Sequence, residues 1–87
     1  MNKLFYLQTY DFDGNQIVLD NHRDLYEPFG MFSICMYVAD KFHRELGIGV
    51  TCYAYDPELK TYELMFDLVP EHSYLRMLKQ LFEPHEV

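Results

Sequence analysis

The stretch that decides the fold is KLFYLQTYDFDGNQIVLD, residues 3–20, because it places a turn signal between two strand-like segments. Asp13 and Gly14 form this signal, since glycine adopts positive φ without steric cost and aspartate tolerates it. With a two-residue loop Tyr10 pairs with Ile17, whereas a three-residue loop shifts the pairing by one position and exchanges the two faces. The sequence therefore predicts an N-terminal β-hairpin in one of these two registers.

A long helix is expected after the hairpin. Residues 21–27 are polar and expected to be irregular, and Pro28 biases the residue before it away from helical conformations. The helix is expected to begin near residues 29–31 and to run to Leu46, because Gly47 suits the left-handed position that ends many helices. Spaced as on one helix face, its expected core residues are Met31, Ile34, Cys35, Val38, Phe42 and Leu46.

A second hairpin and a second helix complete the pattern. Residues 56–59 (DPEL) suit a type I turn between strands over residues 50–55 and 61–69. Alternate residues give the later strand one apolar face, which consists of Tyr62, Leu64, Phe66 and Leu68. Pro70 suits the first turn of a final helix that ends at Pro84. The apolar face of that helix carries Tyr74, Leu75, Leu78, Leu81 and Phe82.

The order ββαββα predicts a single α+β domain over residues 1–87, with a four-stranded antiparallel sheet and two helices packed on one face. The other sheet face is then uncovered, although the first strand offers apolar or aromatic side chains to both faces. The first half of the long helix is likewise apolar almost all round. Both features favour burial in a dimer or under a partner. The residues expected to make this contact are Phe29, Phe32, Met36 and Tyr37.

The charge of the chain excludes some partners and favours others. Fourteen Asp and Glu residues against seven Lys and Arg give a net charge of −7, and 17% of the residues are aromatic. The basic residues form no cluster that could contact phosphates, so direct nucleic-acid binding is not expected. A strongly acidic surface instead favours a protein partner with a basic surface.

The sequence contains no catalytic or metal-binding motif. Neither Ser33 nor Ser73 lies on the strand-to-helix turn that a nucleophile elbow requires, and no glycine-rich loop is present. The four histidines lack the spacing of zinc ligands. Cys35 and Cys52 lie in apolar segments and are expected to be buried, reduced thiols. We therefore expect no enzyme activity, no cofactor and no bound metal.

Acidic and tyrosine side chains near the turns are the candidate binding residues. Carboxylates accelerate the encounter with a basic partner, and exposed tyrosines supply binding energy. If the two hairpin turns are neighbours, their carboxylates form one acidic rim; alternatively, these charges only keep the protein soluble. The expected partner-binding residues are Tyr10, Asp11, Asp13, Asp20, Asp24, Glu27, Tyr55, Asp56, Glu58 and Glu63.

In size, acidity and lack of motifs the chain resembles the small inhibitors carried by phages and mobile elements, among them anti-CRISPR proteins and nuclease immunity proteins. The resemblance is one of composition. It implies an inhibitor or modulator that binds a basic surface, such as that of a nucleic-acid-binding protein. Because no segment reads as a signal peptide or a membrane span, the cytoplasm is the expected location, that of the host if a phage encodes the protein. The alternative function is a homodimeric domain that binds a small ligand or has a regulatory role.

Overall fold

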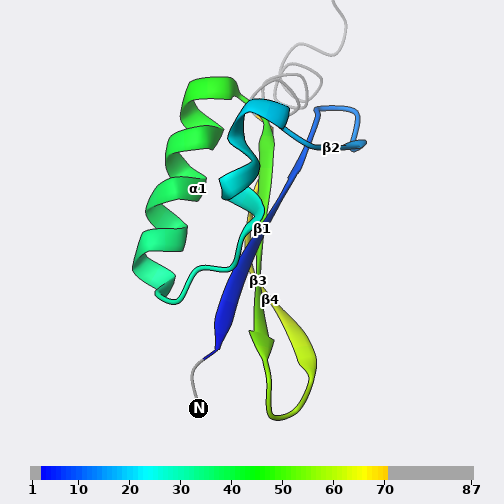
Figure 1. Ribbon diagram of the computed structural model, residues 1–87. Helices are drawn as coiled ribbons and strands as arrows, with labels where there is room; N and C mark the ends of the chain where they lie inside the picture. Colours follow the sequence, from blue (N-terminus) through cyan, green and yellow to red (C-terminus); the bar gives the residue numbers. More distant parts are fainter. Residues whose placement is uncertain (1–2, 71–87) are drawn as a thin grey trace, which may run out of the picture.

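The computed structural model describes residues 3–70, which form a four-stranded antiparallel sheet with helices on one face (Figure 1). The strand order is β2-β1-β3-β4, so β2 and β4 are the edge strands. The predicted α+β class and four-stranded antiparallel sheet are confirmed, and the final helix expected after Pro70 lies outside the described residues. In chain order the elements are β1 (Leu4–Tyr10), β2 (Gln16–Ile17), the 3₁₀ helix η1 (Asp20–Tyr26), α1 (Phe32–Leu46), β3 (Gly49–Asp56) and β4 (Thr61–Leu68).

The β1–β2 hairpin has the register of the three-residue loop. Tyr10 pairs with Gln16, and the N–H of Gly14 donates a hydrogen bond to the carbonyl oxygen of Asp11 at 3.0 Å. Gly14 has a φ of 90°, a conformation that glycine adopts without strain. The side chain of Asp11 also orders the loop, because its Oδ1 accepts the backbone N–H of Asn15 at 2.8 Å. β2 is only two residues long, shorter than expected, since the chain then turns away into η1.

The segment expected to be irregular forms η1, which is joined to β1 by a partly buried hydrogen-bond network. The hydroxyl of Tyr26 accepts the N–H of Leu19 at 2.9 Å. It donates to Oγ1 of Thr9 at 2.7 Å, because the hydroxyl hydrogen of Thr9 is directed to the carbonyl oxygen of Ile17. Thr9 is almost completely buried. These bonds therefore satisfy a polar group that would otherwise destabilise the core.

α1 ends as predicted, but it turns a different face to the sheet. Gly47 adopts the left-handed conformation with φ of 69°, and its N–H donates to the carbonyl oxygen of His43 at 2.9 Å. The completely buried residues of α1 are Cys35 and Ala39. The expectation of a core position is wrong for three apolar residues whose side chains are about half exposed, namely Met31, Ile34 and Leu46.

Small side chains bring α1 close to the sheet, which explains its orientation. Cys35 and Ala39 share one buried cluster with Val50 and Cys52 of β3, and the two sulfur atoms lie 3.6 Å apart. A large aliphatic residue in their place would push the helix away from the sheet. The helix is therefore rotated so that its smallest apolar residues face β3.

The prediction of buried, reduced cysteines is confirmed. Cys35 and Cys52 are both free and both completely buried. Burial, together with the hydrogen bond to Cys52, raises the pKa of Cys35 to about 12. Burial also raises the pKa of Cys52. Both thiols are therefore protonated at neutral pH, and neither supplies the thiolate that nucleophilic chemistry needs.

An irregularity in β4 divides its apolar residues between the two sheet faces. Cys52 pairs with Phe66, but the next residue of β3, Tyr53, pairs with Leu64, so Met65 is an extra residue in the strand. Because side chains alternate along a strand, this bulge reverses the orientation of every β4 residue before it. The prediction of one apolar face is therefore wrong: the core side receives Phe66 and Leu68, and the opposite side receives Tyr62 and Leu64.

We expect Ala39→Leu to destabilise the fold by about 1–3 kcal/mol, because the added carbons meet β3 in a filled core. Ile34→Leu, on the half-exposed side of the same helix, is the matched control and should change the free energy of unfolding by less than about 0.5 kcal/mol. Urea unfolding followed by circular dichroism measures both variants. Equal stability of the two variants contradicts this orientation of α1.

Candidate interaction surface

The sheet face opposite α1 carries a row of tyrosines. Leu7 and Thr9 of β1, and Val50 and Cys52 of β3, are buried beneath the helices, so the residues between and beside them point the other way. Within residues 3–70 no helix packs on this second face, because α1 and η1 join the same buried cluster on the first (Figure 1). The side chains on the second face are Leu4, Tyr6, Gln8, Tyr10, Thr51, Tyr53, Tyr55, Tyr62, Leu64 and Asp67.

Five of these side chains form the cluster that we name the tyrosine face: Tyr6, Tyr53, Tyr55, Tyr62 and Leu64. The ring centroids of Tyr55 and Tyr62 are 4.8 Å apart, and those of Tyr6 and Tyr62 are 6.4 Å apart. Tyr62 is 67% exposed and Leu64 is 59% exposed. Because the rings contact one another on paired strands, the tyrosine face presents apolar surface in a fixed arrangement.

One end of the second sheet face is polar and internally hydrogen-bonded. The hydroxyl of Tyr10 donates to Oδ1 of Asp67 at 2.7 Å, and the hydroxyl of Thr51 donates to the same oxygen at 3.0 Å. The ring of Tyr10 lies against Gly49, where any side-chain carbon would overlap it. Burial, followed by the bond to Asp67, raises the pKa of Tyr10 above its usual value. Tyr10, a predicted binding residue, is therefore already engaged within the protein.

A shallow hollow of about 610 Å³ adjoins the tyrosine face beside the short strand β2. Its walls include Tyr6, Gln8, Tyr53 and Tyr62 from the sheet and Val18 and Arg23 from the segment that follows β2. Amide and guanidinium groups are thus placed next to aromatic rings. A side chain of a partner protein can enter this hollow while the surrounding rings exclude water.

The two acidic turns lie at opposite ends of the sheet. In the antiparallel pair of β1 and β3, Tyr10 is opposite Gly49 and Leu4 is opposite Tyr55. The β1–β2 turn therefore lies at one end and the β3–β4 turn at the other (Figure 1). The paired stretch of β1 from Leu4 to Tyr10 alone spans about 20 Å at the strand rise of about 3.3 Å per residue, and each turn lies beyond one end of it. The single acidic rim, expected if the turns are neighbours, is not formed. One acidic turn stands instead at each end of the sheet that carries the tyrosine face.

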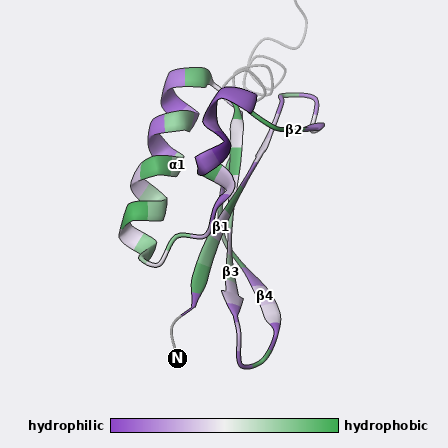
Figure 2. Cartoon of the chain, viewed as in Figure 1, coloured by the Kyte–Doolittle hydropathy of each residue, from purple (hydrophilic) through white to green (hydrophobic). Residues whose placement is uncertain are grey.

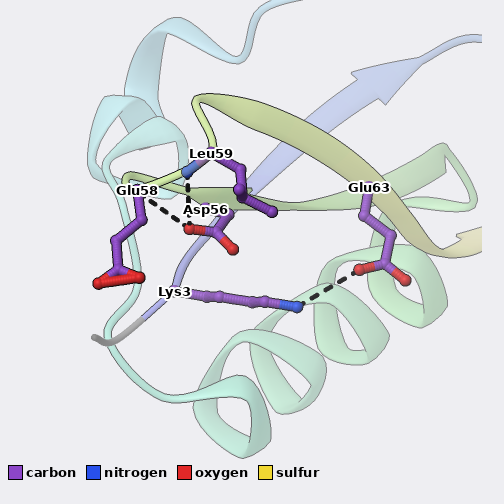
Figure 3. Close-up of polar contacts among 5 residues, drawn as sticks. All are labelled: Lys3, Asp56, Glu58, Leu59 and Glu63. Atoms are coloured by element: carbon purple, nitrogen blue, oxygen red, sulfur yellow. Dashed lines mark hydrogen bonds and ion pairs between the residues drawn. The ribbon is translucent and has the colours of Figure 1, made fainter.

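Two carboxylates near the β3–β4 turn that were expected to bind a partner protein already interact within the chain (Figure 3). Oδ1 of Asp56 accepts the backbone N–H groups of Glu58 at 2.9 Å and of Leu59 at 3.3 Å, so this side chain orders its own turn. Oε1 of Glu63 lies 3.5 Å from Nζ of Lys3. Both members of this ion pair are exposed, so it contributes at most about 1 kcal/mol.

The other carboxylates expected to bind a partner protein divide into two that interact within residues 3–70 and four that do not. Asp20 forms an exposed ion pair with Arg23 at 3.6 Å, and Asp11 orders the first turn. Within residues 3–70, the predicted carboxylates that have no hydrogen-bond or ion-pair partner are Asp13, Asp24, Glu27 and Glu58. These four side chains can receive an incoming cation without breaking an existing interaction.

The four residues expected to contact a second copy or a partner lie in two environments. Phe29 is joined to Phe5 by two backbone hydrogen bonds of 2.8 and 2.9 Å. The ring of Phe32 packs on Phe5 at a centroid distance of 5.3 Å. Both residues are partly buried against the core, whereas Met36 and Tyr37 are exposed on α1.

Most of the tyrosine face is not among the residues predicted from the sequence, which include only Tyr55. The spacing of Tyr53 and Tyr55 by two residues is the signal that both point to one side of a strand. Tyr62 and Leu64 have the same spacing, but the bulge at Met65 decides which sheet face they occupy, and no sequence signal marks that bulge.

Within residues 3–70, no three His, Cys, Asp or Glu side chains are close enough to hold a metal ion. Neither helix in this range is long and apolar enough to cross a membrane. No protein-family model, curated protein or solved structure matches the chain.

We expect the stability of the fold to fall as the pH rises above about 10, the ordinary pKa of tyrosine. Tyr10 has a higher pKa in the folded protein than in the unfolded chain. Its contribution to stability is therefore complete below about pH 10 and is lost as the pH rises toward its folded-state pKa. Urea unfolding at intervals between about pH 8 and pH 12 measures this loss.

Tyr10→Phe is the matched variant for this measurement, because it removes the titrating hydroxyl and keeps the ring over Gly49. Its stability should fall less steeply than that of the wild-type protein over the same pH range. Other groups that titrate at high pH are common to both proteins and cancel in the comparison. An identical fall in the two proteins contradicts a raised pKa of Tyr10 in the folded protein.

Proposed function

We propose that this protein is a non-enzymatic interaction protein that binds a basic surface of another protein through the tyrosine face. The observation that carries this proposal is the exposure of Tyr62 and Leu64 within a cluster of tyrosine rings, on a sheet face that no helix within residues 3–70 covers. Tyrosine is enriched among the residues that dominate binding energy, since it buries a large area and loses little conformational entropy.

The charge of the chain supports a basic partner. The net charge is −7, and the unpaired carboxylates of Asp13 and Glu58 belong to the turns at the two ends of the sheet. An arginine of the partner can stack its guanidinium group on a tyrosine ring and pair with a nearby carboxylate. A partner surface rich in arginine therefore fits both the apolar and the charged part of this surface.

A basic surface that receives carboxylates is also suited to nucleic-acid phosphates. We therefore propose that the target is a nucleic-acid-binding protein or a nuclease, and that the bound protein inhibits or modulates it by occupying the place of the nucleic acid. The compositional resemblance to phage and mobile-element inhibitors, anti-CRISPR proteins among them, supports this role. The cytoplasm, where such targets act, is the proposed location.

Affinity capture on immobilised protein from a bacterial lysate, with mass spectrometry of the retained proteins, tests this function. We expect a basic protein to be retained and to elute as the salt concentration rises, because ions screen exposed charges beyond about 10 Å at 0.1 M. Leu64→Gln should lose most of the retained protein, since it removes apolar surface from the tyrosine face.

The control is Ile34→Gln, which changes an aliphatic side chain of similar exposure on α1, away from the tyrosine face. This variant should retain the same protein as the wild-type chain. Retention that is insensitive to salt, or equal on Leu64→Gln and Ile34→Gln, contradicts the proposed mode of binding.

A further inference from the structure

A second apolar surface lies on the other side of the sheet, in a groove between α1 and β4. The groove has a volume of about 620 Å³. Its apolar lining consists of Phe32, Met36, Tyr37, Met65, Phe66 and Leu68. Figure 2 shows that the N-terminal half of α1, which forms one wall, is mostly apolar. Met65, the extra residue of the β4 bulge, contributes to the opposite wall.

We propose that residues 71–82 of this same chain occupy the groove. The first support is the point at which the chain leaves β4. Nε2 of His43, on α1, donates to the carbonyl oxygen of Val69 at 2.6 Å, and Pro70 is buried. The chain therefore leaves the sheet on the side of α1, at the end of the groove, and not on the side of the tyrosine face.

The second support is the length and pattern of the sequence that follows. Apolar residues recur in it at helical spacing, at Tyr74, Leu75, Leu78, Leu81 and Phe82. A helix of twelve residues is about 18 Å long, and the stretch of α1 from His43 back to Phe32 covers about 17 Å at the same rise of 1.5 Å per residue. A segment that starts beside His43 and runs antiparallel to α1 thus has the length to reach Phe32.

This docking is independent of the proposed function, because it concerns the opposite face of the sheet. Filling the groove removes the apolar surface of Met36 and Met65 from water, which is favourable by about 25 cal/mol for each Å² buried. It also leaves the tyrosine face uncovered. The two apolar surfaces of the molecule therefore have different occupants, one from within the chain and one from outside.

Methionine methyl NMR of the full-length protein tests the proposal. With 13C-labelled methionine methyl groups, we expect nuclear Overhauser effects between the methyls of Met36 or Met65 and those of Leu78. Leu78→Ala should shift the Met36 and Met65 signals. Met31, the exposed residue immediately before α1, is not part of the groove lining, and its signal should keep its position.

The matched control variant is Gln80→Ala, on the polar side of the segment, which should leave the Met36 and Met65 signals unchanged. The Overhauser effects are measured in the wild-type chain, so they test the docking of residues 71–82 even if Leu78→Ala fails to fold. Their absence overturns the proposal. Overhauser effects found only between differently labelled molecules in a mixed sample also overturn it, because the groove then holds a second copy of the chain.

Discussion

The contact of two small residues of α1 with β3 determines which face of the sheet is covered and which is exposed. Cys35 and Ala39 approach Val50 and Cys52 closely enough for the two sulfur atoms to lie 3.6 Å apart. This contact fixes which face of β3 is covered, and the alternation of side chains then places Tyr53 on the other face. The exposed tyrosines are thus a consequence of how the helix packs.

The bulge in β4 is the second constraint, because it changes the side on which a strand presents its apolar residues. Without the bulge, with Met65 paired regularly opposite Tyr53, Tyr62 and Leu64 would share a face with Phe66 and would extend the core. With it, the early half of β4 completes the tyrosine face and the later half supports the groove beside α1. A single inserted residue therefore supplies apolar surface to both sides of the sheet.

Features with a local cause were predictable from the sequence. The turn at Gly14 and the end of α1 at Gly47 depend on backbone conformations that few residues other than glycine adopt readily. The core face of α1 was mispredicted at Ile34, because helical spacing alone does not reveal that β3 requires small residues. The bulge in β4 decides on which sheet face Leu64 lies. The strand order decides that the two acidic turns lie at opposite ends of the sheet. Both arise only when distant segments pair.

Photochemically induced dynamic nuclear polarisation measures which tyrosine rings a dissolved dye can reach, and so tests the uncovered sheet face most directly. We predict a strong signal from Tyr62 in the full-length protein, identified by its loss in Tyr62→Phe. Tyr26, which is partly buried against the core, should give a much weaker signal. A Tyr62 ring as inaccessible as that of Tyr26 would contradict an open tyrosine face, because another part of the chain or a second copy would then cover it.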